Sequence, residues 1–148
     1  MNTKNFLIGG LVGGVVYFLL GWLFYGNLLT QYFQDNPGTA TGVEKTMEQF
    51  EWWALILGNL FWGLVLAYVF TKSGVSTLSS GLITGGILGL LIACAIDFTM
   101  YGTTNILSKK SMLADIAAFT VISAIAGAVV GAVIGMMNRP REVIDTNV

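Results

Sequence analysis

Four long stretches of the chain carry no charged residue. They cover residues 5–34, 52–71, 73–96 and 116–138. A helix that crosses a hydrocarbon core of about 30 Å needs about 20 predominantly apolar residues, because each residue adds about 1.5 Å along the helix axis. The pattern therefore predicts an all-α membrane protein, a single domain in which four transmembrane helices over residues 6–29, 50–71, 77–100 and 112–137 form one bundle.

Polar segments connect the predicted spans. Residues 30–49 form an acidic loop in which Asn-Pro-Gly indicates a turn, and from Val43 the sequence VEKTMEQFEWW predicts a helix that leads into the second span. The link at residues 72–74 is short, so we expect the second and third spans to pack as antiparallel neighbours. Ser111 is the expected N-cap of the fourth span, and residues 139–148 form a polar tail.

The composition favours a membrane protein without a metal or cofactor. The 148 residues are 55% hydrophobic and 10% charged, and the mean hydropathy is +0.75, which leaves too little polar surface for a soluble domain. There is no histidine and only one cysteine, Cys94, so the usual ligands of haem and zinc are missing. We therefore expect no cofactor, no metal site and no enzymatic activity, and a net charge of -1 does not suggest nucleic acid as a partner.

The basic residues give the predicted bundle a weak orientation. With the N-terminus in the cytoplasm, Lys4, Lys72, Arg139 and Arg141 lie inside, against Lys45, Lys109 and Lys110 outside. The positive-inside rule therefore favours cytoplasmic N and C termini. The first apolar run continues past residue 20 without a small-x-small cleavage site, so we expect it to be retained as a span and not removed as a signal peptide.

Glycines recur at four-residue spacing in three of the predicted spans, in the manner of a glycine zipper. Small residues in such rows let two helix backbones approach closely, which favours helix association in lipid. Either all the rows are used inside the bundle, or one faces outward and builds a homo-oligomer or binds a membrane partner protein. The residues that we expect to pack helices are Gly10, Gly14, Gly81, Gly85, Gly89, Gly127, Gly131 and Gly135.

The first and third spans resemble each other at an offset of 76 residues. Both would cross the membrane in the same direction, so a duplicated helical hairpin would form a parallel repeat. Similar composition of two glycine-rich helices is the alternative explanation. The aligned identities are Gly9 with Gly85, Gly10 with Gly86, Gly13 with Gly89, Tyr25 with Tyr101 and Gly26 with Gly102.

Asp97 is the acidic residue at the outer end of the third predicted span. An ionised aspartate at the centre of a membrane helix costs about 2.5 to 3.5 kcal/mol on insertion scales, and less near the interface. Helical periodicity puts it on the same face as Gly89 and Ala93, so it should point toward a packed helix. It either binds a proton, a cation or a cationic substrate, or it is a structural acid satisfied by hydrogen bonds from Tyr101, Thr99, Asn105 or Asn59.

Asp115 and Asn59 are the other polar candidates. Asp115 begins the fourth span, where a helix N-terminus stabilises a negative charge by about 0.3 to 1 kcal/mol. It would lie near the same leaflet as Asp97, so a paired-carboxylate cation site is an alternative. Asn59 in the second span is explained by an interhelical amide hydrogen bond.

Two segments resemble known families. Residues 20–29, LGWLFYGNLL, resemble the Leu-Gly-x-x-Trp-Tyr-x-Pro-Leu-Leu signature of small bacterial four-span membrane proteins catalogued as domains of unknown function, with Phe24 and Asn27 as departures. Residues 85–115 are similar to a sister group that carries Tyr-Asp-x-Thr-Asn and an aspartate at the start of the last span. Asp97, Thr99 and Asp115 match that second pattern, whereas Ile96 and Met100 depart from it. The resemblance implies a four-span fold without an assigned activity, in a bacterial inner membrane.

Three functions are compatible with these residues. The most concrete is a proton- or cation-linked transporter or channel with Asp97 as the titrating group and membrane lipids as surroundings. The second is a structural or accessory subunit that packs against a partner through a glycine row. The third is a membrane enzyme that uses Asp97 and Asp115 on a lipid-borne substrate, which requires the two carboxyl groups to lie within about one water of each other.

Overall fold

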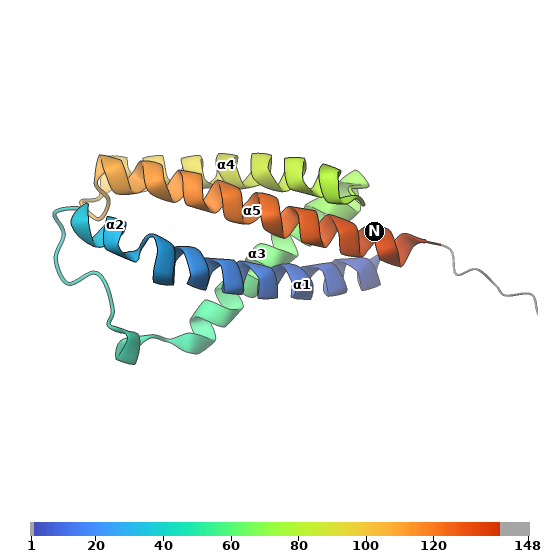
Figure 1. The fold of residues 1–148 in the computed structure, drawn as a ribbon, viewed down its shortest axis with the longest axis horizontal. Coiled ribbons are helices and arrows are strands. Elements are labelled where there is room, and N and C mark those ends of the chain that lie inside the picture. Colours follow the sequence, from blue (N-terminus) through green and yellow to red (C-terminus); the bar gives the residue numbers. More distant parts are fainter. Residues whose placement is uncertain (1, 140–148) are drawn as a thin grey trace, which may run out of the picture.

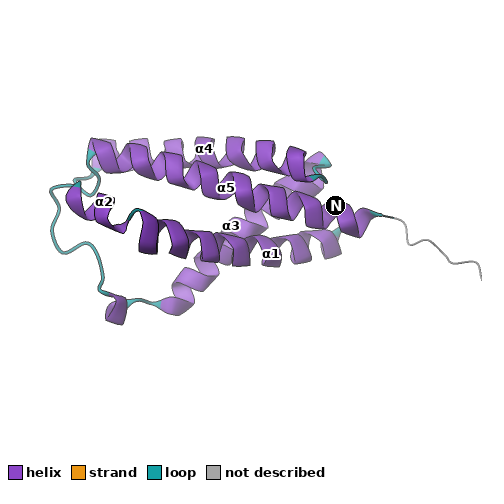
Figure 2. Ribbon diagram, in the orientation of Figure 1, coloured by secondary structure: helices purple, strands orange, loops and turns teal. Residues whose placement is uncertain are grey.

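The computed structural model describes residues 2–139 and is all-helical (Figure 2). The predicted tail beyond residue 139, with Arg141, lies outside the described residues. Four helical segments are long and apolar enough to cross a membrane, which confirms the predicted all-α fold of four spans. They are Thr3–Leu28, Trp52–Ser73, Leu78–Thr103 and Lys109–Asn138.

The first span is made of two kinds of helix. Helix α1 covers Thr3–Leu23 and is capped by the Asn2 side chain, which accepts hydrogen bonds from the Lys4 and Asn5 backbone N–H groups. It continues without a break into the π-helical turn η1, Phe24–Leu28. A π turn holds one residue more than an α turn, so it rotates the side chains that follow relative to the rest of the helix.

The other three spans are regular α-helices with defined ends. Helix α3 covers Trp52–Ser73 and ends at Gly74, which adopts the left-handed conformation (φ 71°) that favours glycine. Helix α4 covers Leu78–Thr103, and helix α5 covers Lys109–Asn138. The N-cap of α5 is Ser108 and not Ser111 as predicted. Ser111 is the third residue of the helix and completes a capping box with Ser108, because each side chain bonds the other residue's backbone N–H.

The loop between the first two spans differs from the prediction. It begins with a short helix α2, Thr30–Asp35, where the sequence suggested only a turn. The helix predicted from Val43 is absent, since only a single 3-10 turn, η2, Met47–Gln49, precedes α3. Gly42 has a positive φ of 69° and Thr46 is extended, and both conformations interrupt a helix at this place.

The same loop packs against the link between α4 and α5. Pro37 and Leu107 form an isolated antiparallel bridge, and the Ala40 N–H donates to the Asn105 carbonyl at 3.0 Å. The Ser108 hydroxyl donates to the Asn36 carbonyl at 2.7 Å. These contacts close one end of the bundle, which we call the loop end; the other, the terminal end, holds both described chain ends, joined by a hydrogen bond from Asn5 to Asn138 of 2.6 Å.

The helices pack as two hairpins that meet through α5. Helix α4 packs against α5, helix α1 packs against α3, and α5 also contacts α1 and α3 (Figure 1). Across residues 2–139, α3 and α4 form no extensive contact, so the prediction that they are packed neighbours is wrong. The short turn at Gly74 fixes only that the chain reverses, whereas α3 runs obliquely behind α1 and leaves α4 beside α5 (Figure 1).

Glycines bring the backbones of each hairpin into direct contact. A methyl group on Gly85 would lie 2.9 Å from the Gly127 Cα atom, and one on Gly14 would lie 2.8 Å from the Leu60 Cα atom. All eight predicted packing glycines face another segment of the same chain: Gly10 and Gly14 face α3, Gly81, Gly85 and Gly89 face α5, Gly127 faces α4, Gly131 faces α4 and Thr77, and Gly135 faces Ser76. These glycines are therefore used inside the bundle.

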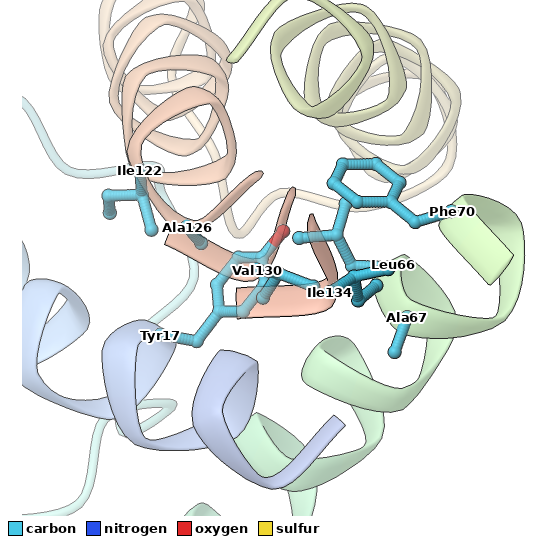
Figure 3. Close-up of a cluster of buried hydrophobic side chains, with 8 residues drawn as sticks. All are labelled: Tyr17, Leu66, Ala67, Phe70, Ile122, Ala126, Val130 and Ile134. Carbon is cyan, nitrogen blue, oxygen red and sulfur yellow. The ribbon is translucent and has the colours of Figure 1, made fainter. Parts of the chain in front are cut away.

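A small core lies where α1, α3 and α5 meet. Its buried side chains are Tyr17, Leu66, Ala67, Phe70, Ile122, Ala126, Val130 and Ile134 (Figure 3). The Tyr17 hydroxyl donates to the Ser123 hydroxyl at 2.9 Å, so the polar end of this ring is satisfied within the core. Large apolar side chains elsewhere point outward, such as Leu11, Phe61, Ile83 and Leu91, which are each at least 60% exposed. Such a surface suits lipid and not water.

Candidate functional site

Asp97 and Asp115 lie together at the contact between α4 and α5. Asp97 continues the buried row of α4 that runs through Gly89 and Ala93 at four-residue spacing. Because α4 and α5 are antiparallel and joined by a short link, the end of α4 lies beside the start of α5, which carries Asp115. The two carboxyl groups lie close to each other.

Among the described residues, no basic side chain pairs with Asp97. The residue is 5% exposed, and its Oδ2 atom is buried without a hydrogen-bond partner among residues 2–139. The salt bridge found within residues 2–139 joins Lys45 to Glu51. Both residues are exposed, and they belong to the loop before α3 and not to α4 or α5. Buried acids are ordinarily paired or fully hydrogen-bonded, so an orphaned carboxylate oxygen beside a second acid indicates a place for a proton or a cation.

Tyr25 is the third member of the site, and it comes from the π turn of the first span. Its hydroxyl lies near the Asp115 carboxyl group. In the sequence Tyr25 stands out only as the counterpart of Tyr101 in the possible repeat. In a regular α-helix Tyr25, eight residues after Tyr17, would lie about 80° away from it around the helix axis, so the spacing carried no signal for this contact.

The remaining predicted site residues do not join the acid pair. The Thr99 hydroxyl donates to the Ala95 carbonyl at 2.7 Å, and the Asn59 amide donates to the Leu55 carbonyl at 2.8 Å, so both bond within their own helix. Tyr101 is 44% exposed. Asn105 uses its backbone carbonyl to bind Ala40. The interpretation of Asp97 as an acid satisfied by these groups is therefore wrong.

A cavity of about 720 Å³ lies between the first span and α3 at the loop end. Helix α3 contacts α1 closely at Gly13 and Gly14, whereas a methyl group on Gly21 would have its nearest neighbour, the Asn59 side-chain oxygen, at 4.0 Å. Aromatic side chains form much of the wall: Tyr17, Phe18, Trp22, Tyr25, Phe50, Trp52, Trp62 and Phe119. Tyr25 both lines the cavity and reaches Asp115, so it stands between the cavity and the acid pair.

The acid pair is not a ready metal site. In the part of the chain that the structure describes, no group of three or more histidine, cysteine, aspartate or glutamate side chains is placed to hold a metal ion. Two carboxylates and a phenol provide fewer oxygen ligands than calcium normally takes. The arrangement suits a proton or a larger cation better than a tightly bound metal ion.

The fold defines the class as a small four-span integral membrane protein. Comparison with protein-family models, with curated proteins and with solved structures finds no match. The four long apolar helices agree with the four-span fold that the resemblance of residues 20–29 and 85–115 implies.

Proposed function

We propose that this integral membrane protein is a proton-linked transporter in which Asp97 and Asp115 bind the transported proton. The single observation that supports it best is the buried pair of carboxyl groups, with one oxygen of Asp97 lacking any partner. Intramembrane acids are expensive to keep and commonly mark proton and ion pathways.

The chemistry of the pair suits reversible proton binding. Two ionised carboxylates in contact repel each other strongly where the surroundings are apolar. A proton on one of them converts the contact into a hydrogen bond, since a protonated carboxyl donates to an ionised one. The charged group that faces Asp97 from α5 is Asp115, and Tyr25 faces the pair from the first span. Loss of the proton therefore changes the force between α4 and α5.

The route for the proton leads past Tyr25. Its hydroxyl can accept a proton from one neighbour and donate another, which links Asp115 to the cavity. The helices of the two hairpins meet through α5, because α3 and α4 do not pack extensively within the described residues, and the loop before α3 adds contacts to the link between α4 and α5. We propose that a small movement of the α1 and α3 hairpin against α5 opens the site to the other side, as in transporters that move one half against the other.

Proton flux in proteoliposomes tests this function. A lumenal pH dye would report the flux that follows an imposed potassium diffusion potential. We expect wild-type protein to carry flux and Asp97→Asn to lose it, since the amide keeps the shape but binds no proton. Asp35→Asn is the matched control, because Asp35 is an exposed residue of α2. Equal flux from Asp97→Asn and wild type, with both folded and monodisperse, would show that Asp97 carries no proton.

The orientation is part of the same proposal. Lys4, Lys72 and Arg139 all belong to the terminal end of the bundle, which would be cytoplasmic under the positive-inside rule. The cavity and the acid pair then lie in the outer half of a bacterial inner membrane. We also propose that the protein acts without catalysis and without a cofactor.

A further inference from the structure

The cavity at the loop end has the size and the lining of a ligand site. Its volume of about 720 Å³ falls within the range of about 300–1,000 Å³ that is usual for small-molecule pockets. Eight aromatic side chains supply flat apolar walls. Polar groups are few among the lining residues, and they gather toward the loop: Thr30, Gln34, Glu44 and Lys45, with Asn59 deeper inside.

The charges around the cavity are mostly negative. Asp97 and Asp115 lie behind Tyr25, and Glu44 lines the cavity toward the loop. Lys45 is the basic residue of the lining, and its ammonium group lies 3.9 Å from the Glu51 carboxylate, which offsets its charge. In an apolar medium the attraction of an acid for a cation acts over a longer distance than it does in water. The faces of tryptophan and tyrosine rings attract cations as well.

We propose that the cavity binds a hydrophobic organic cation, a molecule with an aromatic or alkyl body and one delocalised positive charge. The body would pack between Trp22, Trp52 and Trp62, and the charge would face Tyr25 and the acids behind it. A neutral lipid chain would use the same walls but gain nothing from the acids, and an anion would be repelled. This ligand would be the substrate of the proposed transporter, and its exchange with protons rests on that proposed function. A proton on Asp97 or Asp115 reduces the negative charge that attracts the cation, so binding of the proton and binding of the cation disfavour each other.

Two ions of the same shape and opposite charge provide a direct test. Binding of tetraphenylphosphonium and of tetraphenylborate would be measured by calorimetry on the full-length protein in a neutral detergent, with protein-free micelles subtracted. We expect the phosphonium to bind saturably at one site and the borate not to bind. Asp97→Asn should weaken phosphonium binding. Equal binding of both ions would show that the cavity does not select for positive charge. Absence of phosphonium binding would contradict the proposal that the cavity binds a hydrophobic cation.

Two neighbouring tryptophans give a matched pair of variants. Trp52 lines the cavity, whereas Trp53 does not and donates its ring N–H to Glu51 at 3.0 Å. Both rings are exposed at the start of α3, so neither substitution should unfold the protein. Trp52→Ala should weaken phosphonium binding roughly 2- to 30-fold, the range of one cation–π contact, and Trp53→Ala should leave it unchanged. Equal effects of the two variants would place the ligand outside the cavity.

The outcomes for the ligand and for transport separate cleanly. Saturable phosphonium binding without proton flux would retain the cation site and overturn the transport function. Proton flux that depends on Asp97, without phosphonium binding, would retain transport and overturn this ligand.

Discussion

Asp97 is a buried acid that pairs with no basic side chain in the part of the chain that the structure describes. It sits at the end of a row of small residues, Gly81, Gly85, Gly89 and Ala93, that packs directly on α5. A side chain in that row cannot turn toward lipid or water without separating the helices. The neighbour that it meets is a second acid, so the charge at this contact depends on whether a proton is present.

Tyr25 should be needed for proton movement but not for cation binding. Tyr25→Phe removes the hydroxyl that approaches Asp115 and keeps the aromatic wall of the cavity. We expect proton flux in proteoliposomes to fall, while the affinity for tetraphenylphosphonium stays within about twofold of wild type, since the ring face remains. Tyr68→Phe, at a half-exposed ring of α3, is the matched control and should change neither quantity. If flux through Tyr25→Phe equals that of wild type, the proton does not pass this hydroxyl.

The part of the site that depends on spacing along one helix could be predicted from the sequence. The part that depends on how different helices pack could not. Asp97 could be placed on a packed face because Gly89 and Ala93 precede it at helical intervals. The nearness of Asp115 was an open alternative, since a short link joins the two helices. Tyr25 was missed because a π turn leaves no mark in the hydropathy pattern. Thr99 and Asn59 looked available, but each bonds a carbonyl one turn back in its own helix.

Helices α4 and α5 form the tightest contact of the molecule at the scale of whole elements. Their glycines interlock along the length of the pair, so that Gly81 and Gly85 face Gly127 and Gly131 faces Gly81. Close backbone contact of this kind stabilises helix pairs in lipid through dispersion. It also fixes the register that brings Asp97 to Asp115.

Adding a methyl group to this contact should cost stability. A Cβ atom on Gly85 would lie 2.9 Å from the Gly127 Cα atom and closer still to the Ser123 carbonyl oxygen. We expect Gly85→Ala to reduce the free energy of unfolding by about 1–3 kcal/mol, as overpacking does elsewhere. Gly102→Ala lies in the same helix with open space around it and should be neutral or slightly stabilising. Unfolding in mixed micelles measures both, and equal stabilities would mean that α4 and α5 are further apart.

The apolar spans predicted the helices well, but they did not predict how the helices pair. The length of an apolar run such as residues 52–71 is enough to predict that it forms a helix that spans the membrane. The choice of neighbour depends on which glycine rows fit, and the row of α4 fits α5 and not α3. The loop was also mispredicted, because Gly42 and the contacts of Pro37 with Leu107 favour an extended path over a helix at residues 43–51.

At the scale of the whole molecule, the cavity results from a difference in how the helices of the two hairpins are arranged. Helices α4 and α5 run side by side, whereas α3 diverges from the first span toward the loop end and leaves the cavity between them (Figure 1). The proposed 76-residue repeat remains a prediction, and its two tyrosines have different surroundings: Tyr25 approaches Asp115, but Tyr101 is 44% exposed. A cavity formed by divergence of two helices has no counterpart in the sequence pattern.

The proposed orientation can be measured with single cysteines. In a Cys94→Ala background, a cysteine at Ser73 would mark the terminal end and one at Thr39 the loop end. We expect a membrane-impermeant maleimide to label Thr39→Cys in intact spheroplasts, and to label Ser73→Cys only after lysis. The reverse pattern would place the cavity on the cytoplasmic side.

The most direct test of the central claim is an infrared pH titration of the protein with carbon-13 labelled aspartate. If Asp97 and Asp115 share a proton, Asp97→Asn should remove one aspartate signal and also shift the signal of Asp115, which has lost its partner. Asp35→Asn should remove one signal and leave the others in place, because Asp35 is exposed and bonds only Gln31 among the described residues. If Asp97→Asn likewise left every other aspartate signal unmoved, the two acids would titrate independently and the proposed proton site would be contradicted.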